Sequence, residues 1–182
     1  MSRGRRISRE KEIRPTFFVF CEGPTEEQYV KYLKSKYRVP FEIDSKIAGN
    51  RITAGYIKNY KDSKITDDKD KTFLLFDLDA PKMLDKLLAL DACILLASNP
   101  CIELWFLLHF KEQKANINTK KCENDLARKN KNYKKGVINR QLQSSLGKGQ
   151  IKAVHRAKKL TEYQNPSSTV YKLIEELEKV KI

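Results

Sequence analysis

The sequence predicts an α/β fold in which a mostly parallel, four-stranded sheet has helices on both faces. Three short apolar runs and one loosely alternating segment are each followed by a longer segment of helical periodicity, in the order β-α-β-α-β-α-β-α. This alternation is typical of parallel sheets. The chain has 182 residues, of which 40% are hydrophobic, so it is long enough to bury a sizeable core. After residue 111 the alternation ends, and we expect a basic, helical C-terminal region.

The first two strands and helices follow from local patterns. Residues 17–21 form an apolar run between turn residues, which predicts a buried strand. Thr25, with a glutamine three positions later, matches a capping box and predicts a helix that ends near residue 36. Residues 41–48 alternate loosely and predict the second strand, and 49–65 predict a helix flanked by loops.

The next two strands are equally apolar. Residues 72–76 predict the third strand, and the helix after it is expected to begin at Pro81. Residues 92–97 predict the fourth strand. Asn99-Pro100 then has the composition of a helix cap and first turn, and the helix 101–110 is apolar nearly all round, which indicates an interior position.

The C-terminal part is predicted to be helical. The expected segments are helices at about 119–130, 137–145 and 150–163, a loop at 165–168, and an amphipathic helix from 170 to 180. The expected division of the chain is a flexible basic arm at 1–14, a sheet-containing core at 15–112, and a basic helical extension packed on the core at 113–182.

Composition excludes several classes of protein. No apolar run is long enough to cross a bilayer, and the basic N-terminus has no apolar stretch behind it as a signal peptide would. The four cysteines are isolated and the chain has two histidines, so a structural zinc site is not expected. We expect a cytoplasmic protein with reduced thiols and no membrane association.

The net charge of +14 is unevenly distributed. Between residues 111 and 159 there are fifteen Lys or Arg residues and three acidic ones. One explanation is a solvated helical surface, but exposed faces normally mix both signs. The alternative is a surface for a polyanion, of which nucleic acid is the leading candidate.

Four acidic residues follow two of the predicted strands. They are Glu22 and Glu26 after the first strand, and Asp77 and Asp79 after the third. The C-terminal ends of parallel strands are where such sheets bind ligands, and crowded carboxylates repel unless a hard cation such as Mg²⁺ or Mn²⁺ lies between them. The alternatives are a loop pair that caps a helix and, for Glu26, a simple interaction with the helix dipole.

Two residues of the apolar helix 101–110 are further candidates. Glu103 lies among large apolar residues, where a carboxylate is costly unless it meets a cation or a donor. The alternative for Glu103 is a buried ion pair with a basic residue of the C-terminal region. His109 has no assigned role, and a lone histidine on such a helix is usually a core residue.

The basic region supplies the candidate nucleic-acid contacts. Lys148 lies between two glycines and could reach a phosphate, although a flexible surface loop explains it equally well. The Gly-Lys-Gly sequence does not complete a phosphate-binding loop of the Walker type. The full set of expected nucleic-acid contacts is Lys148, Lys152, His155, Arg156, Lys158 and Lys159.

Four segments resemble the RloB-like family, which includes the second component of the AbiL abortive-infection system. They are FFVFCEGPTEEQYV, FDLD, SNPCIELWFLLHF and NPSSTVYKLIEEL. The resemblance implies a TOPRIM-type fold, in which an EGxxE pair and a DxD pair bind one or two Mg²⁺ ions. Carried over to this chain, those pairs are Glu22 with Glu26 and Asp77 with Asp79, and Glu103 and His109 fall in a family motif.

From the residues and the resemblance together we expect a Mg²⁺-dependent nuclease that acts as the effector of a two-component anti-phage system. One ion held by Glu22 and Asp77 would activate water, and a second, shared with Asp79 or Glu26, would stabilise the leaving oxygen. The substrate stays open between tRNA, other RNA and DNA. The expected partner is an ABC-type ATPase. The alternative is a non-catalytic, nucleic-acid-binding or regulatory subunit of such an ATPase complex.

Overall fold

The computed structural model describes residues 15–37, 42–80 and 82–180. The expected basic arm at 1–14 and the expected helix start at Pro81 lie outside these residues. The elements are β1 (Thr16–Cys21), α1 (Pro24–Tyr37), β2 (Glu42–Ile47), η1 (Gly49–Arg51), α2 (Ala54–Asp62), β3 (Lys71–Asp77), α3 (Met83–Leu88), β4 (Cys93–Asn99), α4 (Ile102–Leu108), α5 (Thr119–Lys129), α6 (Arg140–Lys158), β5 (Ser167–Ser168) and α7 (Tyr171–Lys179).

The sheet has five strands in the order β2-β1-β3-β4-β5. The first four strands are parallel, as predicted, and β5 is antiparallel to β4. The prediction of four strands with a loop at 165–168 was therefore wrong by one strand. Two serines carry no apolar signal, and β5 is held instead by long-range contacts: Ser168 Oγ lies 3.0 Å from Ser98 Oγ, and the Thr169 N–H donates to Ala97 O at 2.8 Å.

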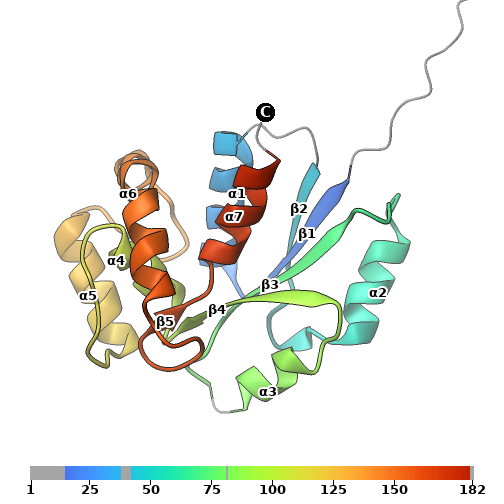
Figure 1. Ribbon diagram of the computed structural model, residues 1–182, viewed down its shortest axis with the longest axis horizontal. Helices are drawn as coiled ribbons and strands as arrows, with labels where there is room; N and C mark the ends of the chain where they lie inside the picture. The colour runs from blue at the N-terminus through green and yellow to red at the C-terminus, as the bar shows by residue number, and fades with distance from the viewer. Residues whose placement is uncertain (1–14, 38–41, 81, 181–182) are drawn as a thin grey trace, which may run out of the picture.

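Helices cover both faces of the sheet (Figure 1). Alternate residues of each central strand belong to two different hydrophobic clusters. In β1, Phe17 and Val19 face the cluster that includes α1 and α7, while Phe18 and Phe20 face the cluster beside α2 and α3. Because both faces are buried, these strands read as continuous apolar runs rather than as alternating ones.

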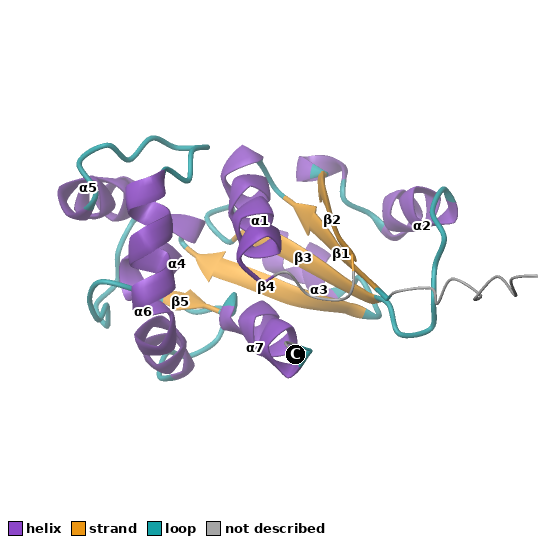
Figure 2. Cartoon of the chain, turned by 90° about the horizontal axis from the view of Figure 1, so that it is seen from above, coloured by secondary structure: helices purple, strands orange, loops and turns teal. Residues whose placement is uncertain are grey.

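Helices α4, α5 and α6 lie together at the end of the sheet toward which β4 points (Figure 2). Every residue of α4 is buried. The two helices expected at 137–145 and 150–163 are one continuous helix, α6, so the prediction of a break there was wrong. Gly149 lies where α6 meets α4, since a Cβ at this position would come within 2.7 Å of His109 O. The glycine thus serves close helix packing and does not end a helix.

Two helix starts differ from expectation. Helix α1 begins at Pro24, and the Gly23 N–H donates to Glu26 Oε2 at 3.0 Å, so Gly23 is the N-cap and Glu26 makes the contact that the predicted capping box gave to Gln28. Thr25 Oγ1 accepts instead from the Gly136 N–H. Helix α4 begins after Cys101, and the Asn99 side chain donates to Tyr163 O rather than capping the helix. None of the helices in the described ranges is long and apolar enough to span a bilayer.

Candidate functional site

The predicted acidic residues lie where the strand order changes direction. Strand β1 is central, the chain passes from it to β2 on one side, and β3 lies on the other side. The crevice outside the C-terminal ends of two such strands is the usual ligand site of open α/β sheets. Glu22 directly follows β1, and Asp77 is the last residue of β3. The topology therefore brings both residues to this crevice.

Hydrogen bonds from the backbone fix the first two carboxylates. The Glu22 side chain accepts the Asp77 N–H at Oε2, 2.7 Å away, which links the ends of β1 and β3. Glu26, in the first turn of α1, is 4% exposed and accepts the Gly23 N–H. Both side chains are thus oriented by the same strand-to-helix turn, and the glycine in that turn gives the backbone room against Glu26.

Asp77 and Glu103 each have a buried oxygen without a partner. Asp77 is 8% exposed and Glu103 is fully buried. Glu103 Oε1 accepts the Tyr133 hydroxyl at 2.5 Å. Asp77 Oδ1 and Glu103 Oε2 have no hydrogen-bond partner among the described residues. Since a buried, unpaired carboxylate oxygen costs free energy, these two atoms indicate a place for a cation or a donor.

We define the carboxylate cluster as Glu22, Glu26, Asp77 and Glu103. Burial raises the pKa of Asp77 well above the usual carboxyl range, and neighbouring negative charges raise it further. Those neighbours, in order of effect, are Glu26, Glu22, Glu103 and Asp79. Burial also raises the pKa of Glu22 and of Glu26. The cluster therefore holds more negative charge than its burial favours, which is the electrostatic condition that a divalent cation relieves.

Asp79 lies beside the cluster without being part of it. Strand β3 ends at Asp77, so the extended segment that would direct both aspartates to one face does not continue to Asp79. Asp79 is exposed, and its charge acts on Asp77 and Glu22. It lines a cavity of about 570 Å³ that opens beyond the ends of β3 and β4.

A loop between α5 and α6 covers the cluster and was missed by the sequence reasoning. Tyr133 binds Glu103, and the Gly136 N–H binds Thr25 in the first turn of α1. Partial burial lowers the pKa of Lys135, but nearby carboxylates, led by Glu103, outweigh this effect and raise it. The alternative of a buried ion pair for Glu103 is not seen among the described residues, where a tyrosine is the donor. No local motif marks this loop, because its role depends on contacts across about thirty residues or more.

The residue types of the carboxylate cluster are those that bind hard cations, but their spacing does not form a complete ligand set among the described residues. Among the residues that the structure describes, no three Asp, Glu, His or Cys side chains are spaced to ligate one ion. The available groups are nonetheless all carboxylates, which suit Mg²⁺ or Mn²⁺. Two of them have an unpartnered buried oxygen, and each lies in the negative field of the others. Asp77 and Glu103 would supply those oxygens, with Glu22 and Glu26 beside them.

The expected nucleic-acid contacts separate into two groups on α6. One group is an exposed row at helical spacing, which we call the basic row: Lys148, Lys152, His155 and Lys159. Lys148 is helical rather than in a loop, so that part of the prediction was wrong. Lys158 is paired with Glu175, and Arg156 Nη1 donates to Leu108 O at 2.6 Å. Lys158 and Arg156 therefore already contact other parts of the protein and are less available to nucleic acid than the basic row.

His109 is a core residue in this structure. It is 6% exposed, its Nδ1 lies 2.9 Å from Trp105 O, and its ring packs edge-on against Trp105 at 4.8 Å. Burial lowers the pKa of His109 to about 4, so the imidazole is neutral at pH 7. These contacts place it between α4 and α6, in contact with Gly149 rather than in the carboxylate cluster.

Comparison with known proteins identifies a family. A family model described as RloB-like protein matches residues 17–177. The match takes in the carboxylate cluster, the loop that covers it and α6. Neither a curated protein nor a solved structure matches the chain. The chain belongs to the RloB-like family.

Proposed function

We propose that this RloB-like protein is a metal-dependent nuclease with a TOPRIM-type site, in which the carboxylate cluster binds Mg²⁺ or Mn²⁺ and the basic row binds nucleic acid. One observation carries the proposal. Two buried carboxylate oxygens, Asp77 Oδ1 and Glu103 Oε2, have no partner among the described residues, and they lie at the point of the sheet where ligands are expected. Their neighbours are also carboxylates, which raise the pKa of Asp77 further.

The bound ion would polarise a phosphate oxygen and lower the pKa of a bound water molecule, so that hydroxide is available at neutral pH. The residues of the chain provide the rest. The backbone bonds to Glu22 and Glu26 hold these carboxylates in place before substrate arrives. Tyr133 donates to Glu103 and keeps that side chain directed into the cluster. Lys135, on the covering loop and 3.5 Å from Glu123, would bring a positive charge toward negative charge that develops on a phosphate.

The basic row would bind the substrate backbone. Its members are exposed, and none of its three lysines has an ion-pair partner within 4 Å among the described residues. Unpaired lysines at helical spacing can each displace a counterion from a phosphate, which makes binding depend on salt. The substrate is a nucleic acid, with tRNA the first to test. By its family resemblance, the protein would be the effector of an anti-phage abortive-infection system beside an ABC-type ATPase.

A second candidate function is a non-catalytic, nucleic-acid-binding subunit of such an ATPase complex. The observation that favours it is that no three side chains of the described residues are spaced to ligate one ion. In this case the carboxylate cluster would be structural, and only the basic row would act.

A cleavage assay separates the two functions. Purified protein is incubated with tRNA, other RNA or plasmid DNA in Mg²⁺ or Mn²⁺, beside Asp77→Asn. The matched control is Asp91→Asn, because Asp91 is exposed and precedes β4 at the opposite end of the strand. The nuclease predicts cleavage by the wild type and the control, and none by Asp77→Asn. An effector that is silent alone is tested in cells under phage challenge with the same variants, and equal protection by all three would contradict the nuclease.

A further inference from the structure

Two cavities beyond the ends of β3 and β4 share part of their lining. The first, of about 570 Å³, begins at Asp79 and lies outside the ends of β3 and β4. The second, of about 390 Å³, lies between the C-terminal end of α6 and the segment after α4. Asn116 and Asn165 line both cavities. The two cavities therefore adjoin at these residues, and we call the pair the carboxamide groove.

Side-chain amides are concentrated in this groove. The carboxamide residues that line it are Asn99, Gln113, Asn116, Asn118, Gln164 and Asn165. Asn165 is structural, because it exchanges two hydrogen bonds with the Ile117 backbone at 2.9 and 2.7 Å. Asn116 and Gln164 are exposed, and neither side chain has a hydrogen bond to another described residue. These two carboxamides are therefore available to a ligand, in a groove whose shape Asn165 holds.

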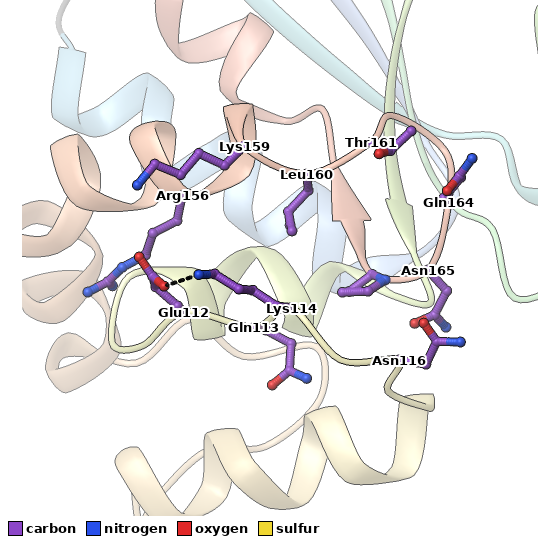
Figure 3. Close-up of a pocket in the computed structure, with 11 residues that line it drawn as sticks. Glu112, Gln113, Lys114, Asn116, Arg156, Lys159, Leu160, Thr161, Gln164 and Asn165 are labelled. Atoms are coloured by element: carbon purple, nitrogen blue, oxygen red, sulfur yellow. Dashed lines mark ion pairs between the residues drawn. The ribbon is translucent and has the colours of Figure 1, made fainter.

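The far end of the groove carries positive charge. Figure 3 shows Arg156, Lys159 and Glu112 at one end of the second cavity and Asn116 with Asn165 at the other. Lys114 is neutralised by Glu112, 3.4 Å away. Arg156 is anchored through Nη1 to Leu108 O, which leaves its other guanidinium nitrogens for a ligand. Lys159 is exposed and belongs to the basic row.

We infer that the carboxamide groove binds one unpaired nucleotide of a single-stranded substrate, with its base against Asn116 and Gln164 and its phosphate at Arg156 and Lys159. This inference rests on the proposed function and names its substrate class. Asn and Gln side chains match the paired donor and acceptor groups on base edges, and Arg binds phosphate in a bidentate manner. Leu160 offers an apolar wall for a base face.

A strand explains the groove better than a free nucleotide or a duplex does. Asp79 lines the groove and lies two residues beyond Asp77, the last residue of β3, so a strand bound in the groove would run toward the carboxylate cluster. In a duplex, base edges are stacked and paired, and they enter a concave pocket only when a nucleotide is flipped out or the strand is single.

The test compares binding of a single strand and of a duplex in EDTA. The probe is a fluorescent RNA about ten nucleotides long, used alone or annealed to its complement. Wild-type protein is compared with the double variant Asn116→Ala, Gln164→Ala and with Asn59→Ala, an exposed asparagine on α2. We expect the double variant to bind the single strand about tenfold more weakly and the duplex unchanged. The Asn59 control should match the wild type.

Three outcomes would overturn the inference: an unchanged single-strand affinity, an equal loss for single strand and duplex, or adenosine monophosphate binding as tightly as the oligonucleotide. Each is distinct from failure of the proposed function. The binding assay is repeated in the Asp77→Asn protein, which should bind the single strand as the wild type does. Cleavage that survives Asp77→Asn would refute the nuclease site and leave the binding result standing. Because both substituted side chains are exposed, the melting temperature should be unchanged in the double variant.

Discussion

Asp77→Asn should make the metal-free protein more stable while it removes the proposed activity. Asp77 is 8% exposed, its Oδ1 has no partner among the described residues, and four neighbouring carboxylates raise its pKa. Asparagine has the same shape and no charge, and its amide can donate to the neighbouring carboxylates. Residues kept at a cost to stability are a feature of functional sites.

The size of the effect follows from the unpaired oxygen. Leaving a buried polar group unsatisfied costs about 1–3 kcal/mol, and more for a charged group. For a chain of this length, each kcal/mol changes the melting temperature by about 2–4 °C, so the variant should melt about 2–12 °C higher. Asp79→Asn is the matched control, because Asp79 is exposed and its substitution should change the melting temperature little.

The assay is thermal unfolding in EDTA at several pH values. Because the pKa of Asp77 is raised in the folded state, the folded chain binds more protons than the unfolded chain between the ordinary carboxyl pKa and the raised one. The free energy of unfolding of the wild type therefore falls as pH rises through this window. The advantage of Asp77→Asn should be largest above the raised pKa and should shrink on acidification. A variant that melts at or below the wild-type temperature at neutral pH would refute the reasoning.

The remaining predictions concern α6 and its neighbours. Gly149→Ala should destabilise the protein by about 1–3 kcal/mol, because the added Cβ would lie 2.7 Å from the backbone oxygen of His109. Gly147→Ala, where the added Cβ has room, should stabilise the protein by up to about 1 kcal/mol. Denaturant unfolding should therefore give changes of opposite sign in the free energy of unfolding for the two variants. Lys152→Ala should reduce the slope of log affinity for nucleic acid against log salt concentration by about 1, because Lys152 is exposed and has no ion-pair partner among the described residues. Lys158→Ala should leave this slope unchanged, because Lys158 is already ion-paired with Glu175. Equal slopes for the two variants would contradict the proposal that the basic row binds phosphates. Because the pKa of His109 is lowered in the folded state to about 4, the folded chain binds fewer protons than the unfolded chain between that pH and about 6.5. His109 therefore contributes about 3 kcal/mol to the free energy of unfolding above pH 6.5, and this contribution is lost as the pH falls toward 4. An NMR titration that finds an ordinary pKa for His109 would rule this out.

Sequence patterns predicted β1, β3 and β4 because these strands are largely buried on both faces, whereas the more exposed β2 was predicted from a loose alternation. Such strands carry a continuous apolar run that local composition reveals, as in β1 and β3. Strand β5 could not be found in this way, since it is held by contacts that span about seventy residues, between Ser98 and Ser168 and between Ala97 and Thr169. The glycines of α6 misled for a related reason. Two glycines on either side of one lysine are typical of a loop, so the sequence predicted a break in the helix. The structure shows instead that Gly149 allows the close contact between α6 and the end of α4.

The candidate site was predictable to a similar degree. Glu22 and Asp77 could be placed together because parallel strands end at one edge of the sheet. Tyr133 and Lys135 could not, since their proximity to Glu103 depends on how the α5–α6 loop folds back over the sheet edge. Asp79 was expected beside Asp77 on one strand face, but β3 ends at Asp77, two residues before Asp79.

Binding of Mn²⁺ to the purified protein tests the central claim most directly. Mn²⁺ takes the place of Mg²⁺ at oxygen sites, and the loss of its free-ion electron paramagnetic resonance signal counts the ions bound. The account predicts saturable binding by the wild type and by Asp91→Asn, and its loss in Asp77→Asn and in Glu103→Gln. If the wild type binds no Mn²⁺ at saturation, or if Asp77→Asn binds it as well as the wild type does, the carboxylate cluster is not a metal site.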